Sequence, residues 1–266
     1  IASCLVGSEM CIRDRTKSHR GEFNATPGPQ LAAYSVKAAV ERSGIEPELI
    51  EDLVMGCGYP EGITGKNIGR QTALRAGLPL SVAGMVASRF CASGLQSVAI
   101  AAGRIVAEGV PAMVAGGVES ISAIRAGNPA DIDPWLQEHK PDLYMAMIDT
   151  ADIVAHRYGI SREDQDAFSL QSQQRTAAAQ QAGVFADEIV PCTTRMMEKN
   201  KETSEVTYRE VTATHDNCNR ASTTLEGLAK LEPVKGPGQF ITAGNASQLS
   251  DGCLLYTSDA ADERSS

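Results

Sequence analysis

A cysteine between an apolar segment and a helical segment is the residue of this sequence best suited to covalent chemistry. Residues 83–87 form a short apolar run that is typical of a buried strand. After Cys91, apolar residues recur at three- and four-residue steps until Gly109 and Pro111, which predicts a helix with a glycine end. We therefore expect Cys91 on the first turn of a helix, where unpaired N–H groups and the helix dipole stabilise a thiolate. Because the thiolate is the nucleophilic form, Cys91 is a candidate nucleophile.

The alternative for Cys91 is an inert buried cysteine, since cysteine is among the most buried residue types. The small neighbours Ala92, Ser93 and Gly94 would leave room for a substrate. The position of Cys91 alone leaves both interpretations open, because a single cysteine in a sequence does not show whether it is catalytic or structural.

The sequence around Cys91 resembles the active-site motif of thiolases. Residues 91–98 read Cys-Ala-Ser-Gly-Leu-Gln-Ser-Val, and the thiolase motif is Cys-x-Ser-Gly-Leu followed by a helix of small residues. Other segments resemble thiolases in the same order along the chain, namely residues 55–57, 67–71, 114–120, 158–163, 187–191, 224–231 and 242–247. The resemblance covers roughly residues 16–252. It implies a layered α-β-α fold, of which this chain carries the N-terminal half, with an inserted, mostly helical loop domain.

Composition and charge argue against several kinds of partner. The chain has 266 residues, a net charge of -9 and no basic cluster, so nucleic acid is not an expected partner. We find no apolar run of the roughly 20 residues that cross a membrane and no secretory leader pattern, so no membrane association is expected. Seven cysteines without a Cys-x-x-Cys or Cys/His cluster predict neither a disulfide scaffold nor a metal site. A reducing cytoplasm fits this composition best.

Both ends of the chain have unusual sequences. Residues 1–15 and 253–266 resemble translated sequencing-adapter read-through, so we expect them to be artefacts and exclude them from the functional argument. The alternative at the N-terminal end is a genuine strand at residues 4–6. Thiolases have a central first strand at the corresponding place. If residues 1–15 are an artefact, that strand is missing from this chain or only roughly matched by it.

The chain between these ends predicts an α/β fold. Strands are expected at residues 53–57, 83–87 and 112–115, and helices at residues 31–42, 66–75 and from Cys91 to Gly109. This alternation predicts right-handed crossovers and a largely parallel sheet. The helix that begins at Cys91 is apolar on most sides, so we expect it to be buried between layers.

The regularity breaks after residue 120, at three X-Pro pairs between residues 128 and 141. Helices are then predicted at residues 150–158 and 161–182, a strand at 187–192 and a charged surface segment at 196–211. The resemblance assigns residues 16–120 to the core of the N-terminal half, 121–239 to the inserted CoA-binding loop domain and 240–252 to the return of the chain to the core.

Four residues match positions that bind CoA or the acyl group in thiolases. Arg220 would pack beside the CoA nucleotide, since a guanidinium suits both stacking and phosphate contact. Ser247 would bond the pantetheine arm, Ala243 would offer its backbone to the same arm, and Met147 would line the acyl pocket. The ordinary alternatives are a solvated arginine, a loop serine bonded to its own backbone and a core methionine. Glu119 could be a catalytic carboxylate, although the resemblance implies a structural role close to the cysteine.

The sequence also departs from thiolases. Ala146 stands where many have a histidine, and the four histidines of the chain match no catalytic histidine. The segments Asn-Glu-Ala-Phe, Gly-His-Pro and Cys-Gly-Gly, which carry the remaining catalytic groups of thiolases, do not occur in this chain. We therefore expect the chain alone to have no thiolase turnover. The sequence around Met147 resembles that of acyl-CoA acetyltransferases of the β-oxidation type.

The resemblance implies an acyltransferase that cleaves 3-ketoacyl-CoA with CoA, or runs the reverse Claisen condensation, through an acyl-cysteine. CoA is then a substrate, no other cofactor is expected, and the full-length protein would be a homodimer or homotetramer. One alternative is a condensing enzyme of the ketoacyl or hydroxymethylglutaryl synthase type, against which residues 114–120 and 244–247 argue. The other is a non-catalytic carrier of CoA or lipid, in which Cys91 would be unreactive.

Overall fold

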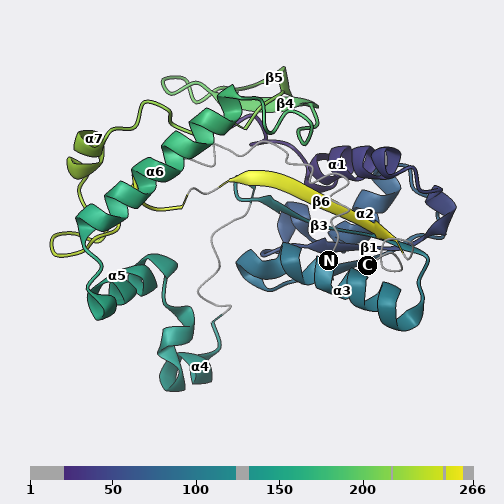
Figure 1. Ribbon diagram of the computed structural model, residues 1–266, viewed down its shortest axis with the longest axis horizontal. Helices are drawn as coiled ribbons and strands as arrows, with labels where there is room; N and C mark the ends of the chain where they lie inside the picture. The colour runs from purple at the N-terminus through teal and green to yellow at the C-terminus, as the bar shows by residue number, and fades with distance from the viewer. Residues whose placement is uncertain (1–20, 124–131, 217, 248–249, 260–266) are drawn as a thin grey trace. The chain divides into compact units, whose positions relative to one another are not determined.

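The computed structural model describes residues 21–123, 132–216, 218–247 and 250–259 (Figure 1). The contacts divide the chain into two compact units. The first comprises residues 1–124, 186–218 and 249–266, and the second comprises residues 125–185 and 219–248. The predictions for residues 1–15, including the strand at residues 4–6, and for residues 260–266 lie outside the described residues.

The first unit contains a four-stranded sheet with the strand order β2-β1-β3-β6. Strands β1 (Ile50–Gly56), β2 (Ala83–Ala87) and β3 (Ala112–Ser120) are parallel, which confirms the predicted parallel arrangement. Gly56 lies in register with Ala87 and with Gly117, so the carboxyl ends of the parallel strands meet at one edge of the sheet.

Strand β6 (Asp251–Asp259) runs antiparallel to β3 and pairs with it from Ala112 to Ser120. It includes residues 253–259, part of the C-terminal segment expected to be an artefact. Strand pairing does not identify the origin of a segment, so that expectation stays a prediction.

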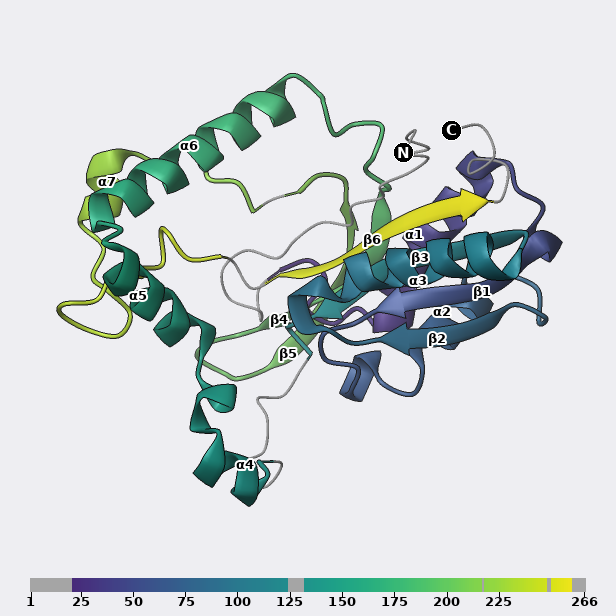
Figure 2. The same ribbon diagram turned by 60° about the horizontal axis from the view of Figure 1, so that its bottom comes forward.

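Helices cover both faces of this sheet, as the layered α-β-α fold requires (Figure 2). Leu53 and Met55 point to the face covered by α1 (Gly28–Ser43) and α2 (Ile68–Arg75). Val54 points to the opposite face, where it packs with Ala101 and Ile105 of α3 (Ser93–Glu108). β1 is therefore apolar on both sides, as strands of covered parallel sheets are.

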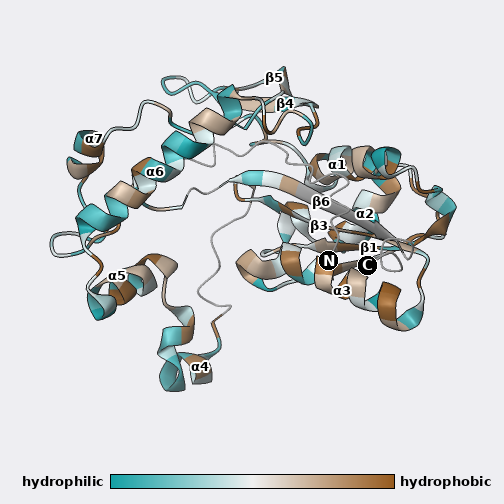
Figure 3. Ribbon diagram, in the orientation of Figure 1, coloured by the Kyte–Doolittle hydropathy of each residue, from teal (hydrophilic) through white to brown (hydrophobic). Residues whose placement is uncertain are grey.

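Helix α3 is buried on one face only, so the expectation that it lies between layers is wrong. Its buried residues are Ser93, Ser97, Ala101 and Ile105, which follow one another at four-residue steps. Leu95 and Val106 are 75% and 66% exposed. Figure 3 shows hydrophobic residues along this helix.

The helix over residues 90–108 also corrects the expectation that no segment has the length and composition to cross a membrane. It has 19 residues, and an 18-residue window of it, of which 22% is buried, has a mean hydropathy of 1.4. Core helices of soluble proteins have this length and composition too, so the feature is weak evidence of a membrane span.

Residues 192–213 form a β-hairpin that the sequence did not predict. Strand β4 (Cys192–Lys199) pairs with β5 (Val206–Ala213). The strand expected at residues 187–192 begins only at Cys192. The segment expected at the surface, residues 196–211, is mostly exposed, as predicted, but most of it is strand. Near its base the hairpin is buried on one face only. The buried residues there alternate with exposed ones and are Cys192, Thr194, Val211 and Ala213.

Hydrogen bonds attach this hairpin to the first unit. The Asn24 side chain donates to the carbonyl of Met197 and accepts from its N–H, both at 2.9 Å. The hydroxyls of Thr26 and Thr194 are 2.7 Å apart. Residues 186–218 therefore group with the first unit, which differs from the predicted extent of the inserted domain, residues 121–239.

The second unit is mostly helical. It contains α4 (Pro134–His139), α5 (Met147–Tyr158), α6 (Arg162–Gln181) and α7 (Leu225–Ala229). Ser161 caps α6 by accepting a hydrogen bond from the N–H of Asp164 at 3.0 Å.

Short 3-10 turns occur in the chain at Pro47–Leu49, Gly62–Thr64, Phe90–Ala92 and Pro141–Tyr144.

Candidate active site

Cys91 lies at the edge of the sheet where the parallel strands end. β2 ends at Ala87, and Cys91 occupies the 3-10 turn Phe90–Ala92, which leads into α3. It therefore precedes the α-helix by one short turn, whereas the sequence placed it on the first turn. Ligands of open α/β sheets bind at this edge. The side chain is exposed, whereas the alternative of an inert cysteine requires burial.

The turn that carries Cys91 has an unusual backbone. Phe90 has a φ of 48°, a left-handed conformation that is uncommon for a bulky residue. Ser93, only 3% exposed, bridges this turn: its hydroxyl accepts from the N–H of Arg89 at 2.8 Å and donates to the carbonyl of Phe90 at 2.6 Å. These two bonds offset the conformational cost of the Phe90 backbone.

The first turn of α3 packs directly on the ends of β1 and β3. A Cβ atom at Gly56 would lie 2.4 Å from the carbonyl carbon and oxygen of Ser93. A Cβ atom at Gly117 would lie 3.3 Å from the Cα of Gly94. The hydroxyl of Ser97 donates to the carbonyl of Gly116 at 2.7 Å. Glycines at the strand ends thus set the position of the helix that follows Cys91.

Two titratable groups meet beside the end of β1, namely Cys57, which is buried, and Glu119 of β3, which is half-buried. The thiol of Cys57 donates to Oε1 of Glu119 at 3.7 Å, and the N–H of Gly58 donates to Oε2 at 2.7 Å. Burial raises the pKa of the Glu119 carboxyl. Burial, with the negative charge of Glu119, raises the pKa of the Cys57 thiol to about 12. Cys57 therefore stays protonated near neutral pH and is unsuited to nucleophilic attack.

We expect iodoacetamide to modify Cys91 in the folded chain far faster than Cys57 near neutral pH. Cys91 is exposed, whereas Cys57 is buried and its raised pKa keeps it in the unreactive thiol form. Peptide mapping by mass spectrometry at successive times measures both rates. Equal rates in urea would show that the folded structure causes the difference, and equal rates in the native chain would contradict the prediction.

The second unit contains a cavity of about 280 Å³. Arg220 and Ala243, two of the four residues predicted to bind CoA, both line it. Its remaining lining comes from Gln173, Ser222, Thr223, Thr224, Gly227, Leu228, Leu231, Gly244 and Ala246. Ser247 is exposed and does not line this cavity. Met147, at the start of α5, is 73% exposed and lies outside it as well.

Gln173 of α6 holds the segment that carries Arg220. Its side-chain oxygen accepts from the N–H of Arg220 at 2.8 Å and from the side chain of Asn219 at 2.9 Å. The backbone of Arg220 is therefore fixed, and Arg220 is an exposed residue that lines the cavity. Sequence reasoning missed Gln173, because its partners are more than 40 residues away in the chain.

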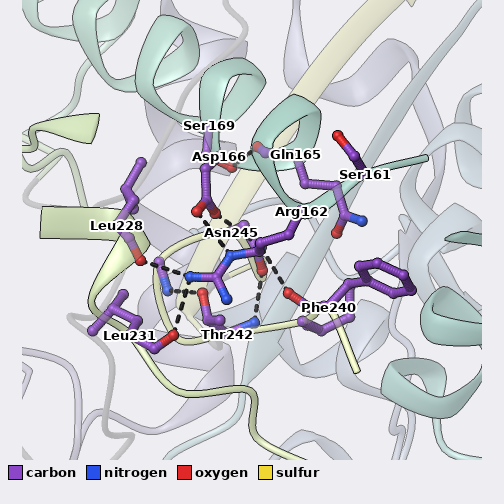
Figure 4. Close-up of polar contacts among 12 residues, drawn as sticks. Ser161, Arg162, Gln165, Asp166, Ser169, Leu228, Leu231, Phe240, Thr242 and Asn245 are labelled. Carbon is purple, nitrogen blue, oxygen red and sulfur yellow. Dashed lines mark hydrogen bonds and ion pairs between the residues drawn. The ribbon is translucent and has the colours of Figure 1, made fainter. Parts of the chain in front are cut away.

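A buried ion pair holds two other walls of the cavity (Figure 4). Arg162 Nη2 donates to the carbonyls of Leu228 and Leu231 at 2.6 and 3.0 Å. Its Nε bonds Oδ2 of Asp166 at 2.8 Å, and Asp166 is 2% exposed. Asn245 Nδ2 donates to the other oxygen of Asp166 at 3.1 Å, so the same carboxylate also holds the chain beside Gly244 and Ala246.

The family of the chain follows from its sequence and its fold together. A family model described as the N-terminal domain of thiolase matches residues 11–255. The chain belongs to the thiolase family. The matched range extends by a few residues into both terminal segments that were expected to be artefacts.

Curated relatives and a solved structure agree with this assignment. The chain is 38% identical to "3-ketoacyl-CoA thiolase" of Bacillus subtilis, over 89% of this chain and 60% of that protein. It is 37% identical to "Acetyl-CoA acetyltransferase" of Chromobacterium violaceum, over 92% of this chain and 64% of that protein. Human mitochondrial 3-ketoacyl-CoA thiolase in complex with CoA has a TM-score of 0.77 and 27% identity, over 98% of this chain and 65% of that one. The thiolase chain thus spans 60–65% of the length of these relatives.

Replacement of Arg162 by methionine should destabilise the second unit of this thiolase chain by about 3–5 kcal/mol, because it leaves the Asp166 carboxylate buried without its partner. Urea unfolding followed by circular dichroism measures the loss. Lys235→Met is the matched control: the Lys235–Asp149 pair is 3.0 Å long but about 40% exposed on both sides. We expect a cost of at most about 1 kcal/mol there. Similar costs for the two variants would contradict the assigned role of Arg162.

Proposed function

We propose that this thiolase chain supplies the nucleophile and part of the CoA-binding surface of an acyltransferase that cleaves 3-ketoacyl-CoA with CoA. The observation that carries this proposal is the exposure of Cys91 on a constrained turn at the carboxyl edge of the parallel strands. The names of the relatives, 3-ketoacyl-CoA thiolase and acetyl-CoA acetyltransferase, support it. Membership of the thiolase family favours this activity over that of a ketoacyl or hydroxymethylglutaryl synthase.

The proposed reaction has two steps through a thioester on Cys91. In the first, the Cys91 sulfur, having lost its proton to a base, bonds to C3 of the substrate. The C2–C3 bond then breaks, and its electron pair goes to C2, which takes up a proton to give acetyl-CoA. In the second, the deprotonated sulfur of CoA bonds to the acyl carbon, and the Cys91 sulfur leaves with the electron pair of its bond. The products are acetyl-CoA and an acyl-CoA shortened by two carbons.

Each step places negative charge on the oxygen of the attacked carbonyl. N–H groups at the start of α3 are suited to stabilise such an oxyanion, because a helix presents unpaired donors at that end. We assign the proton transfers to no described residue of this chain. The resemblance to thiolases implies that the proton transfers belong to the Asn-Glu-Ala-Phe, Gly-His-Pro and Cys-Gly-Gly segments.

We propose that CoA binds as a substrate at the cavity of the second unit and that no other cofactor takes part. Arg220 and Ala243 line this cavity, and an exposed guanidinium suits a phosphate or a nucleotide base. The similar human thiolase is described in complex with CoA, which supports this ligand. Ser247 and Met147 remain proposed contacts to the pantetheine arm and the acyl group. Among the described residues, no group of three or more His, Cys, Asp and Glu side chains is arranged to hold a metal ion.

We propose a cytoplasmic location and a homodimeric or homotetrameric full-length protein. The location is supported by the composition of the sequence, since seven cysteines in 266 residues, with no Cys-x-x-Cys pair, fit a reducing compartment. The oligomeric state is supported only by the resemblance to thiolases.

The function is tested by assaying thiolysis of acetoacetyl-CoA and of a longer 3-ketoacyl-CoA, with CoA as the second substrate. We expect turnover by the full-length protein of this gene and none by the 266-residue chain alone, since the three catalytic segments of thiolases do not occur in it. The ratio of the two substrates gives the chain-length class. An inactive full-length protein that still binds CoA would favour the carrier, and a 266-residue chain as active as a whole thiolase would contradict the assignment of the proton transfers.

A further inference from the structure

Glu119 is a half-buried carboxylate near the candidate nucleophile that the proposed reaction does not use. It lies on β3, two residues beyond Gly117, whose backbone approaches α3. Successive residues of a strand alternate between its two faces. Glu119 and Gly117 therefore both lie on the face of the sheet that α3 covers. The Glu119 carboxylate bonds Cys57 and Gly58 and not Cys91, so the geometry gives no support to a direct catalytic role.

The carboxylate of Glu119 fixes the three residues that follow β1. Oε2 accepts from the N–H of Gly58 at 2.7 Å, and the N–H of Tyr59 also bonds the carboxylate. Oε1 accepts from the thiol of Cys57 at 3.7 Å. Hydrogen bonds from N–H groups to a carboxylate are stronger than neutral ones, so this side chain is a strong anchor of residues 57–59. The Thr64 hydroxyl, which donates to the carbonyl of Tyr59 at 2.6 Å, is another.

Residues 57–59 in turn contact the start of the turn that carries Cys91 and the residues just before it. The ring of Tyr59 packs edge-on against that of Phe90, with centroids 5.9 Å apart. A Cβ atom at Gly58 would lie 3.5 Å from the Cα and the carbonyl oxygen of Phe90, so the two backbones are in close contact. The hydroxyl of Ser88 donates to the carbonyl of Gly58 at 3.3 Å.

We propose that Glu119 is a positioning residue for Cys91, acting through residues 57–59 on the Phe90 backbone. Ser93 holds the turn from the α3 side, and Glu119 holds it from the β1 side. Phe90 keeps its left-handed conformation only while both supports are present, because surrounding contacts must maintain a strained backbone. This inference deepens the proposed function, on which it rests for the role of Cys91.

Amide hydrogen exchange of the folded chain tests this directly. The N–H of Arg89 bonds Ser93 Oγ and that of Ala92 bonds the carbonyl of Arg89, so both amides report on the turn. In Glu119→Ala, we expect these two amides to exchange at least about tenfold faster, the factor that loss of a charged hydrogen bond produces. Glu119→Gln keeps one oxygen acceptor for the Gly58 N–H and should restore part of the protection.

Asp251→Ala provides the matched control. Asp251 is a carboxylate of the same sheet that is more deeply buried than Glu119, and it accepts from the N–H of Ser122 at 2.8 Å. We expect the exchange of Arg89 and Ala92 to be unchanged in this variant. If Asp251→Ala accelerates them as much as Glu119→Ala does, the effect is general destabilisation and the proposal is overturned.

Iodoacetamide labelling of Cys91 separates this inference from the proposed function. We expect Glu119→Ala to shift the labelling rate towards that of the urea-unfolded chain, with Glu119→Gln intermediate. Unchanged turn amides and an unchanged labelling rate would overturn the positioning role and leave the role of Cys91 standing. If the turn amides respond as expected but no acyl group reaches Cys91 in the full-length protein, the positioning stands and the proposed function fails.

Discussion

Replacement of Cys91 by serine is expected to lower the turnover of the full-length protein by at least about 10⁴-fold, since removal of a catalytic nucleophile can cost about 10⁶-fold in kcat. Serine has nearly the same shape, so the turn and the start of α3 should be retained. Its hydroxyl is not ionised near neutral pH, and it is a poorer leaving group than a thiol in the second step. The measurement is thiolysis of acetoacetyl-CoA and a longer 3-ketoacyl-CoA by wild type and variant.

Cys57→Ser is the control for this experiment. Cys57 is buried at the end of β1, and its raised pKa makes it unsuited to attack, so the variant should keep most of the activity. Turnover that survives Cys91→Ser would remove Cys91 from the reaction. CoA binding that survives in a protein without any turnover would favour the carrier.

Gly56→Ala should have the second large effect, a destabilisation of about 1–3 kcal/mol or more. The new Cβ atom would lie 2.4 Å from the carbonyl carbon and oxygen of Ser93, and these are backbone atoms that cannot rotate away. The first turn of α3 must therefore move away from the end of β1, and the turn that carries Cys91 must move with it. Urea unfolding followed by circular dichroism measures the cost.

Gly103→Ala is a matched control in the same part of the fold. Gly103 lies within α3, is exposed, and has no atom within 4 Å of the position a Cβ would take. Alanine is favoured over glycine in a helix by about 0.5–1 kcal/mol, so this variant should be more stable than wild type. Equal stability of Gly56→Ala and wild type would show that α3 does not pack on β1 as described.

The sequence was most informative where a local pattern decides the structure. Strand β2 has the predicted bounds, and α3 ends before Gly109, because apolar spacing and glycine ends are properties of neighbouring residues. The hairpin β4–β5 was missed because its exposed charged residues interrupt the apolar alternation. The exposed face of α3 was missed because composition shows that a helix is apolar but not what lies beside it.

The candidate site was predicted only in part. Cys91, Arg220 and Ala243 were found through a family motif, which identifies residue types at fixed spacing. Ser93, Gly56, Gln173 and the Arg162–Asp166 pair were not assigned roles, because these depend on contacts between distant segments. Arg162 shows the limit clearly: its partner Asp166 is four residues away on α6, but the carbonyl of Leu228 that it also holds is 66 residues away.

The central claim, that Cys91 carries the acyl group, is tested most directly by trapping the intermediate. The full-length protein is mixed with 3-oxohexanoyl-CoA in the absence of free CoA, quenched in acid and mapped by mass spectrometry. The account predicts a butanoyl group on the peptide that contains Cys91, and none on that peptide in Cys91→Ser. A butanoyl group on another residue, or turnover without any acylated protein, would contradict it.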